Sequence, residues 1–129
     1  MPTILIVDDE QKIREFIGLF LRADKYRTFE APDGKTALAL LMREQIDLII
    51  LDVMLPDISG FELCGKIREQ SSVPIIFLTA LADEEYQMLG YRTEGDDYIT
   101  KPFSAPILLA KVHRILQRCA PAAPPPTDI

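Results

Sequence analysis

Short apolar runs recur along this chain, separated by longer stretches of mixed polarity. The runs cover residues 4–7, 48–51 and 75–78, with a shorter one at 98–99, and are rich in Ile and Leu. Short continuous runs of this kind are typical of strands buried on both faces of a parallel sheet. Several of the stretches between them carry apolar residues at helical spacing. The pattern therefore predicts strands that alternate with helices.

The helical pattern is clearest directly after the first strand. There Ile13, Phe16, Ile17, Phe20 and Leu21 fall on one face of a helix. The remaining predicted elements are a strand over 26–30, a turn at 32–34 leading into a helix with Ala37, Leu38, Leu41 and Met42, a helix with Phe61, Cys64 and Ile67, a weakly periodic helix over 83–92, and a last helix with Leu108, Val112 and Ile115.

Five strands alternating with five helices predict an α/β fold of the flavodoxin-like, doubly wound type. Right-handed crossovers favour a parallel sheet with the strand order 2-1-3-4-5. In such a sheet the carboxyl ends of the strands share one edge, so polar residues that follow different strands converge there. The residues in that position are Asp8, Asp9, Asp52, Thr79 and Lys101.

Three of these residues are carboxylates, and the predicted strand order brings them into one pocket. At a separation of about 4 Å and an effective dielectric constant of about 20, each like-charge pair costs on the order of 4 kcal/mol. A cation or protons must offset that repulsion. Oxygen ligands without His or Cys favour a hard ion such as Mg²⁺. The alternative for Asp8 and Asp9 is that they cap the helix that begins near Glu10, but capping does not explain Asp52, Thr79 and Lys101.

Length and composition predict one globular domain, because the chain has 129 residues of which 48% are hydrophobic. The composition changes near the end, where residues 120–129 contain four of the ten prolines. We expect a folded domain over residues 1–118 and a linker or disordered tail, rich in Pro and Ala, over 119–129.

Net charge and hydropathy exclude some partners for this segment. A net charge of −6 disfavours nonspecific binding to nucleic acid, which needs clustered Lys and Arg. The chain has no apolar stretch of membrane-spanning length, and its N-terminus runs into a strand without a signal-like region. We expect a cytoplasmic protein. Cys64 and Cys119 have neither metal-ligand spacing nor disulfide density, and are interpreted as incidental thiols.

The polar residues stand in four ordered motifs, at residues 4–10, 51–60, 74–80 and 96–103. In these motifs the chain resembles the receiver domains of two-component response regulators, and the resemblance covers residues 3–118. It implies that Asp52 is the nucleophile that accepts a phosphoryl group from a histidine kinase.

The resemblance also implies roles for the neighbouring residues. Mg²⁺ would be held by Asp9, Asp52 and the backbone carbonyl of Met54, with Asp8 acting mainly through a bound water. Lys101 and the Thr79 hydroxyl would each contact one phosphoryl oxygen. The simpler interpretation of Lys101 is a salt bridge to Asp52. The simpler interpretation of Thr79 is an ordinary β-branched residue at the end of a strand.

Two further features follow from the family pattern. Pro102 is expected after a cis peptide bond that aims Lys101 into the pocket. Tyr98 occupies the position of an aromatic switch residue that turns inward when Thr79 moves toward the phosphoryl group. The simpler interpretation of Tyr98 is a half-buried ring with a solvated hydroxyl.

Within the family the chain looks most like regulators that carry a winged-helix DNA-binding domain. Those usually dimerise through helix 4, strand 5 and helix 5, and Asp97 and Lys111 match positions that pair across that interface. Lys25 stands where Gly is usual. We expect transcription control through a separate effector domain, which alone would contact DNA. The alternative is a stand-alone receiver that relays phosphoryl groups or docks without phosphorylation.

Two other classes fit less well. A phosphatase of the haloacid dehalogenase type needs a second Asp two residues after the nucleophile, where this chain has Met54. A flavodoxin-like cofactor binder needs a phosphate-binding loop after the first strand, where residues 8–10 are all acidic and would repel a phosphate.

Overall fold

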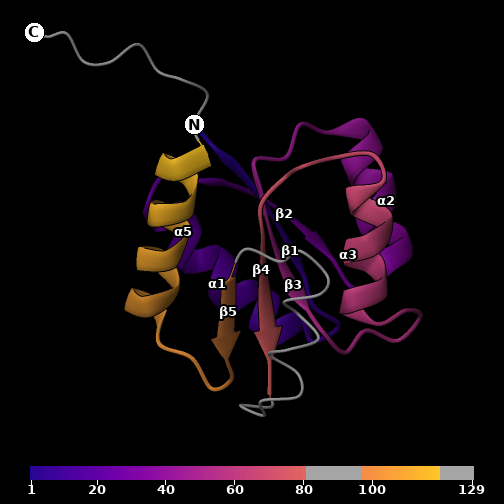
Figure 1. Ribbon diagram of the computed structural model, residues 1–129. Coiled ribbons are helices and arrows are strands. Elements are labelled where there is room, and N and C mark those ends of the chain that lie inside the picture. Colours follow the sequence, from indigo (N-terminus) through magenta and orange to yellow (C-terminus); the bar gives the residue numbers. More distant parts are fainter. Residues whose placement is uncertain (81–96, 120–129) are drawn as a thin grey trace, which may run out of the picture.

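A five-stranded parallel sheet organises the chain (Figure 1). The computed structural model describes residues 1–80 and 97–119. The strand order is β2-β1-β3-β4-β5, which confirms the predicted topology. The strands are β1 (Thr3–Val7), β2 (Arg27–Ala31), β3 (Leu48–Asp52), β4 (Ile75–Thr79) and β5 (Asp97–Thr100).

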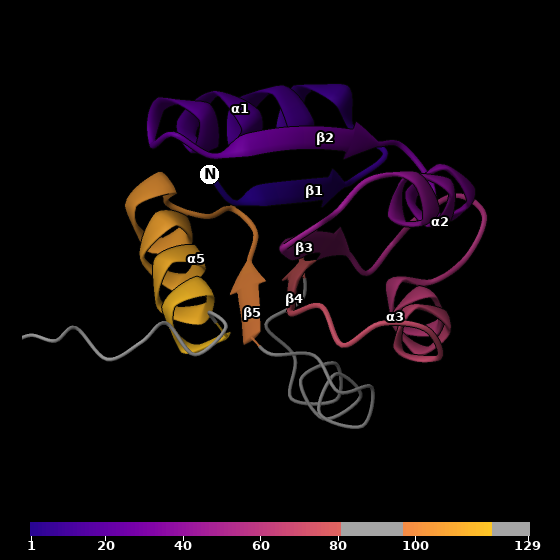
Figure 2. The same cartoon turned by 90° about the horizontal axis from the view of Figure 1, so that it is seen from above.

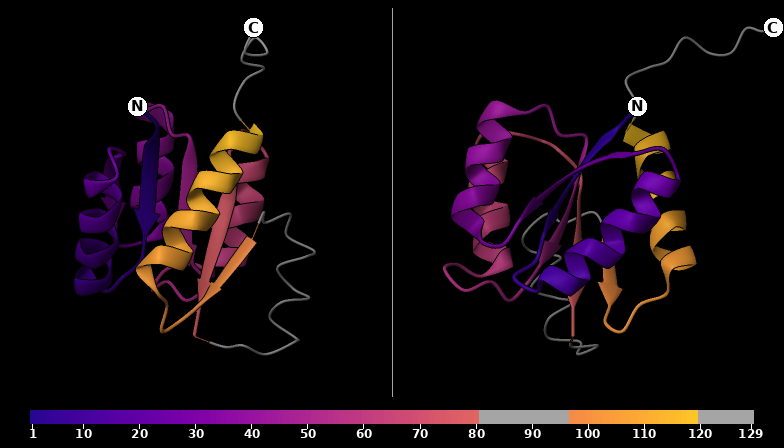
Figure 3. Two further views of the ribbon diagram at one scale, coloured as in Figure 1. Left: turned by 90° about the vertical axis from the view of Figure 1, so that its left-hand side faces the viewer. Right: turned by 180° about the vertical axis from the view of Figure 1, so that it is seen from behind.

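Helices cover both faces of the sheet. Viewed from above, α1 and α5 lie against one face, and α2 and α3 against the other (Figure 2). The view from behind shows the same division (Figure 3, right). The helix predicted over residues 83–92 and the tail predicted over 119–129 lie outside the described residues, apart from Cys119 at the end of a helix. The described helices are α1 (Gln11–Ala23), α2 (Gly34–Arg43), α3 (Gly60–Arg68) and α5 (Ala105–Cys119).

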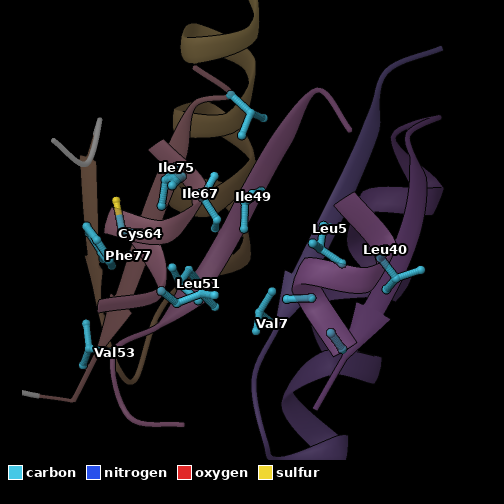
Figure 4. Packing of buried hydrophobic residues seen from close by; sticks show 14 residues of the cluster. Leu5, Val7, Leu40, Ile49, Leu51, Val53, Cys64, Ile67, Ile75 and Phe77 are labelled. Atoms are coloured by element: carbon cyan, nitrogen blue, oxygen red, sulfur yellow. The ribbon is translucent and has the colours of Figure 1, made fainter. Parts of the chain in front are cut away.

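The sheet separates two apolar layers, because successive side chains of a strand point to opposite faces. Ile4 and Ile6 of β1 pack in the layer beneath α1 and α5, and Leu5 and Val7 pack in the other. Every residue of β3 and β4 is buried, as expected for central parallel strands. Figure 4 shows the layer under α2 and α3, with Leu5, Val7, Leu40, Ile49, Leu51, Val53, Cys64, Ile67, Ile75 and Phe77 labelled.

The apolar faces of the helices are confirmed in part. Leu108, Val112 and Ile115 of α5 are fully buried, as predicted. Phe16 of α1 is 44% exposed, and Met42 of α2 is 80% exposed. Each of these two helices touches the sheet along a strip narrower than its apolar face, so residues at the margin of the face remain in contact with solvent.

Loop residues fix where the helices begin and end. The Asp33 carboxylate accepts a hydrogen bond from the Thr36 amide, and Ser59 Oγ accepts one from the Glu62 amide, so both residues are helix N-caps. After α1 the chain turns through Lys25, which has φ of 69°. This left-handed conformation favours glycine, which explains why Gly is usual there in the family that the chain resembles.

Candidate functional site

Parallel register brings the polar residues of β1 and β3 to the same edge of the sheet. Val7 pairs with Leu51, so Asp8 comes directly beyond β1 beside the end of β3. Asp52 is the last residue of β3 and pairs with Leu78 of β4. The predicted convergence of these side chains is therefore observed.

Asp52 is a nearly buried carboxylate at this edge, with 4% of its surface exposed. Its Oδ1 accepts a hydrogen bond from the Met54 amide at 3.1 Å. Its Oδ2 lies 3.3 Å from Lys101 Nζ. One oxygen is thus held by the backbone and the other by a single ammonium group.

Asp8 is fully buried beside the same ammonium. Its Oδ2 lies 3.1 Å from Lys101 Nζ as an ion pair, and no hydrogen bond of ordinary geometry reaches this oxygen within the described residues. Its Oδ1 accepts a hydrogen bond from the Glu10 amide at 2.9 Å. The N-cap residue of α1 is Glu10, and its side chain makes no capping hydrogen bond. The predicted alternative, capping of this helix by Asp9, is therefore not observed.

Lys101 connects the two buried carboxylates. Its backbone amide donates to the Thr79 carbonyl at 2.7 Å, which fixes the lysine beside the end of β4. The Lys101–Pro102 peptide bond is cis, as the family pattern implied. The predicted salt bridge to Asp52 is present, and a second one to Asp8 accompanies it.

The pKa values of the pair reflect burial and mutual contact. Burial raises the pKa of Asp52, and the nearby charge of Asp8 raises it further. The hydrogen bond from the Met54 amide and the contact with Lys101 lower it, but the net shift is upward. Burial alone would lower the pKa of Lys101. The contacts with Asp8 and Asp52 outweigh burial, so the pKa of Lys101 is raised and its ammonium stays charged.

An open pocket of about 400 Å³ lies over Asp52. Carboxylate oxygens of Asp8, Asp9 and Glu10 come within 4.8 Å of one another at its acidic side. Lys101 is the ammonium in contact with Asp8 and Asp52, and it lies 3.9 Å from Glu10. The lining residues are Asp9, Glu10, Asp52, Met54, Leu55, Pro56, Ala80 and Lys101.

These residues suit a hard divalent cation. The carboxylates of Asp8, Glu10 and Asp52 lie within 4 Å of one ammonium, and Asp9 lies beside Asp8 and Glu10. The donor atoms offered are oxygens, and one buried carboxylate oxygen, Asp8 Oδ2, has a cation contact but no directed hydrogen bond among the described residues. Oxygen donors of this kind are those that Mg²⁺ and Ca²⁺ take in proteins.

Thr79 and Tyr98 lie on the neighbouring strands β4 and β5. Thr79 ends β4 and is 2% exposed. Tyr98 of β5 is half-buried, and its ring stacks on Phe77 with centroids 5.8 Å apart. The simpler prediction of a half-buried Tyr98 ring is therefore confirmed for this structure.

A family comparison agrees with this geometry. The model of the response regulator receiver domain matches residues 4–113. The chain belongs to the response regulator receiver domain family. The predicted resemblance is confirmed, and the receiver is a signalling domain.

Among curated relatives, response regulator ArlR of Staphylococcus aureus is 45% identical over 118 residues, which are 92% of this chain and 54% of ArlR. The probable transcriptional regulator ycf27 of Galdieria sulphuraria is 44% identical over 115 residues, which are 89% of this chain and 45% of that protein. The receiver therefore spans about half the length of these relatives.

Solved structures support the same conclusion. The response regulator DrrB of Thermotoga maritima, an OmpR/PhoB homolog, has a TM-score of 0.85 and 39% identity, with 92% of this chain and 54% of DrrB covered. The receiver domain of the Francisella response regulator 1452 has a TM-score of 0.87 and 36% identity, with 92% and 98% covered. The receiver resembles those of OmpR-like regulators, as predicted.

The two charged residues predicted at a dimer interface are paired within this receiver. Lys111 Nζ donates to Asp97 Oδ1 at 3.0 Å and to the Tyr98 carbonyl at 3.0 Å. Arg114 Nη2 donates to Asp97 Oδ2 at 2.7 Å. The involvement of Arg114 was not predicted. Dimerisation remains a prediction.

Sequence reasoning missed the contacts of two further side chains. Arg14 donates to the Asp8 carbonyl at 2.6 Å and pairs with Glu30 at 3.1 Å. Asp57 binds backbone amides at the start of α2. Neither set of contacts follows from a sequence pattern, because the Arg14–Glu30 pair and the Asp57 hydrogen bonds each join elements that are separate along the chain.

None of the helices in the described ranges, 1–80 and 97–119, combines the length and the apolar character that a membrane crossing requires.

Proposed function

We propose that this receiver accepts a phosphoryl group on Asp52 from a phosphohistidine of a sensor histidine kinase, with Mg²⁺ bound beside it. One observation carries the proposal: Asp52 is a nearly buried carboxylate in contact with Lys101 at the base of an open acidic pocket. A structural salt bridge needs no such opening. Phosphoryl transfer does, because the donor must approach the nucleophile in line.

In the proposed reaction a carboxylate oxygen of Asp52 attacks phosphorus. The bond from phosphorus to the donor nitrogen breaks, and its electron pair stays on the imidazole of the donor. The product is an acyl phosphate on Asp52. The contact between Lys101 and Asp52 lets this ammonium turn from the carboxylate to a phosphoryl oxygen, where it balances the charge of the transferred group.

The proposed metal ligands are Asp9, Asp52 and the Met54 carbonyl, with Asp8 acting through a water. Mg²⁺, when bound, neutralises charge on the phosphoryl oxygens. Asp9 and Met54 line the pocket with Asp52, and buried Asp8 lies behind them. The proximity of Glu10 supports the site by adding negative charge at its rim.

The proposed switch acts through Thr79 and Tyr98. A phosphoryl group adds negative charge and acceptor oxygens at Asp52, and the Thr79 hydroxyl moves toward it. Tyr98 then turns into the space that Thr79 leaves. The stacking of the Tyr98 ring on Phe77 supports this proposal, because Phe77 and Thr79 are two residues apart on β4 and so face the same side of the sheet.

An apolar rim beside the pocket supports a protein as the phosphoryl donor. Phe16 is 44% exposed, and its ring lies 5.9 Å from that of Phe103. These two residues line a second hollow that shares Ala80 and Lys101 with the acidic pocket. A protein that packs on this rim would present its phosphohistidine at the mouth of the acidic pocket.

The proposed output is control of transcription through a DNA-binding domain separate from the receiver. The relative ycf27, a probable transcriptional regulator, supports this proposal. We also propose that phosphorylation promotes a homodimer through β5, α5 and the helix predicted over residues 83–92. The receiver is proposed to act in the cytoplasm, where its kinase has access to ATP. The receiver would assist its own phosphorylation and dephosphorylation without acting on another substrate.

Intact-mass spectrometry after incubation with Mg²⁺ and acetyl phosphate tests the proposal. We expect the mass of one phosphoryl group on the wild type, removal of that mass by neutral hydroxylamine, and no adduct on Asp52→Asn. Asp47→Asn is a matched control, since Asp47 directly precedes β3, at the opposite end of the strand from Asp52, and the adduct should persist. The absence of an adduct on the wild type would favour the alternative, a receiver that docks without phosphorylation.

A further inference from the structure

We infer that Asp57 is a positioning residue of the proposed magnesium site, because its carboxylate ties the loop that carries Met54 to the start of α2. This inference rests on the proposed function. The loop, residues 53–59, follows the phosphoacceptor strand β3 and leads into α3. Asp57 acts through Met54 and touches neither the metal nor the phosphoryl group.

The tie consists of two hydrogen bonds to one carboxylate. Asp57 Oδ1 accepts from the Gly34 amide at 2.9 Å, and Oδ2 accepts from the Lys35 amide at 3.0 Å. These amides belong to the first turn of α2, where helix amides lack partners within the helix. The third amide there, that of Thr36, is taken by Asp33 at 2.7 Å. The two carboxylates therefore serve different amides.

The two caps differ in what they connect. Asp33 directly precedes α2, so its hydrogen bond stays within one turn. Asp57 lies more than twenty residues further along the chain, so its hydrogen bonds join two separate elements. Removing Asp33 weakens the start of α2 alone. Removing Asp57 weakens it and also frees the loop.

Electrostatics favour the charged form of Asp57. The hydrogen bond from the Gly34 amide is the largest cause that lowers the pKa of this carboxyl, and the Lys35 amide contributes in the same direction. The partial positive charge at a helix N-terminus adds a favourable field. The tie is therefore fully formed at neutral pH.

Close packing at Gly34 is an independent sign of the same contact. A Cβ atom on Gly34 would lie 2.4 Å from Ile58 Cγ2, far inside van der Waals distance. The loop thus rests directly on the backbone of α2, with room for no side chain between them.

The remaining backbone contacts of the loop lie at its two ends, and between them Asp57 and Ile58 attach the loop to α2. Near its start, the Met54 amide donates to Asp52 Oδ1 at 3.1 Å. Near its end, Met54 and Ser59 form an isolated antiparallel bridge, and the Gly60 amide donates to the Val53 carbonyl at 2.9 Å. Between these anchors stand Leu55 and Pro56, which line the acidic pocket, and the Met54 carbonyl belongs to the peptide bond that begins this segment.

The position of the Met54 carbonyl matters for Mg²⁺ binding, because Mg²⁺ requires ligands in near-octahedral geometry at about 2.0–2.1 Å. A loop that drifts would carry the proposed carbonyl ligand of Met54 out of that range. Loss of a residue that orients a metal ligand typically weakens metal affinity by about 10- to 100-fold.

The test compares Asp57→Ala with Asp33→Ala, each of which removes one cap of α2. We measure Mg²⁺ affinity by titration calorimetry, and amide hydrogen exchange of the metal-free proteins. We expect Asp57→Ala to weaken Mg²⁺ binding by about 10-fold or more and to speed exchange in residues 53–59. Asp33→Ala should bind Mg²⁺ as the wild type does and show faster exchange only in α2. Asp57→Asn, which keeps one acceptor oxygen, should fall between Asp57→Ala and the wild type.

Equal Mg²⁺ affinities for the Asp57→Ala and Asp33→Ala proteins would overturn the inference while leaving the proposed function intact. If Asp57→Ala does not fold, Asp57→Asn with wild-type affinity and unchanged loop exchange would overturn it too. A wild type that binds no Mg²⁺ and gains no phosphoryl group would instead refute the proposed function itself, and the inference with it.

Discussion

At the scale of single residues, two carboxylates share one ammonium. Lys101 Nζ lies 3.1 Å from Asp8 Oδ2 and 3.3 Å from Asp52 Oδ2. A buried charge that loses its partner costs several kcal/mol, whereas replacing a charge that is poorly compensated can stabilise a protein. Lys101 should therefore contribute to stability, and Asp52 should reduce it when no metal is bound.

The Asp52→Asn variant should be more stable than the wild type without metal at pH 7, by on the order of 1 kcal/mol. Burial raises the folded-state pKa of Asp52 above its unfolded value. The contribution of this carboxyl to stability is therefore fully present below about pH 4, where it is protonated in both states, and is lost as the pH rises through the folded pKa. Urea unfolding in EDTA across this range measures the difference, which should shrink toward low pH. A variant several kcal/mol less stable at pH 7 would show that Asp52 is a structural ion-pair residue.

The Lys101→Met variant should lose about 2–3 kcal/mol of stability, because the buried carboxylates would lose their ammonium partner. The loss should be smaller than for a fully buried pair, since the Lys101 side chain is 16% exposed. Adding Asp8→Asn should restore most of it. Lys12 is an exposed lysine that lines the neighbouring apolar hollow. Lys12→Met is therefore the matched control and should change the free energy of unfolding little. Equal effects of both lysine variants, measured by urea unfolding, would contradict the pairing.

At the scale of elements, the start of α3 governs how the loop after Asp52 is placed. A Cβ atom on Gly60 would lie 2.3 Å from the Asp52 carbonyl oxygen and 2.7 Å from Val53 Cα. Both are backbone atoms, so they cannot turn aside as a side chain could. Gly60 is therefore required for the chain to double back over β3.

A pair of glycine variants in α3 tests this requirement. Gly60→Ala should lower the free energy of unfolding by about 1–3 kcal/mol, the usual cost of overpacking. Gly65→Ala lies in the same helix, where nothing would meet the new Cβ within 4 Å, and should raise it by about 1 kcal/mol through helix propensity. Thermal or urea unfolding of both variants gives the comparison. Two changes of the same sign would count against the proposed role of Gly60.

The elements themselves could be predicted from sequence because burial on both faces leaves a strong pattern. β3 and β4 were predicted from their apolar runs, and the site residues Asp8, Asp52 and Lys101 followed from the strand order. What could not be predicted arises from tertiary contact. The exposure of Phe16 depends on how far α1 leans over the sheet, and the tie from Asp57 to α2 depends on the path of a loop.

At the scale of the whole molecule, the sheet edge turns distant parts of the sequence into one site. Asp8 follows β1, Asp52 ends β3, and Lys101 follows β5, yet both carboxylates lie within hydrogen-bonding distance of the Lys101 ammonium nitrogen. Part of the negative charge at this site is left uncompensated. A cation that binds the pocket only in the folded state therefore stabilises the entire fold.

Mg²⁺ should raise the melting temperature of the wild type. At a free concentration of about 100 times the dissociation constant, binding contributes about 2.7 kcal/mol. Differential scanning calorimetry over a Mg²⁺ series measures the shift, with choline chloride at matched ionic strength as the salt control. The shift should be much smaller in Asp9→Asn, which lacks a proposed ligand. A wild-type melting curve that Mg²⁺ leaves unchanged would argue against the metal site.

Borohydride trapping with peptide mapping tests the central claim most directly. After incubation with Mg²⁺ and acetyl phosphate, borohydride reduces an aspartyl phosphate to the alcohol and releases phosphate, which marks the phosphorylated residue by a permanent change of mass. We predict that the mark appears in the wild type at Asp52 alone and requires both Mg²⁺ and the phosphodonor. A mark at Asp8, Asp9 or Asp57 in place of Asp52, or no mark at all, would contradict the assignment of Asp52 as the phosphoacceptor.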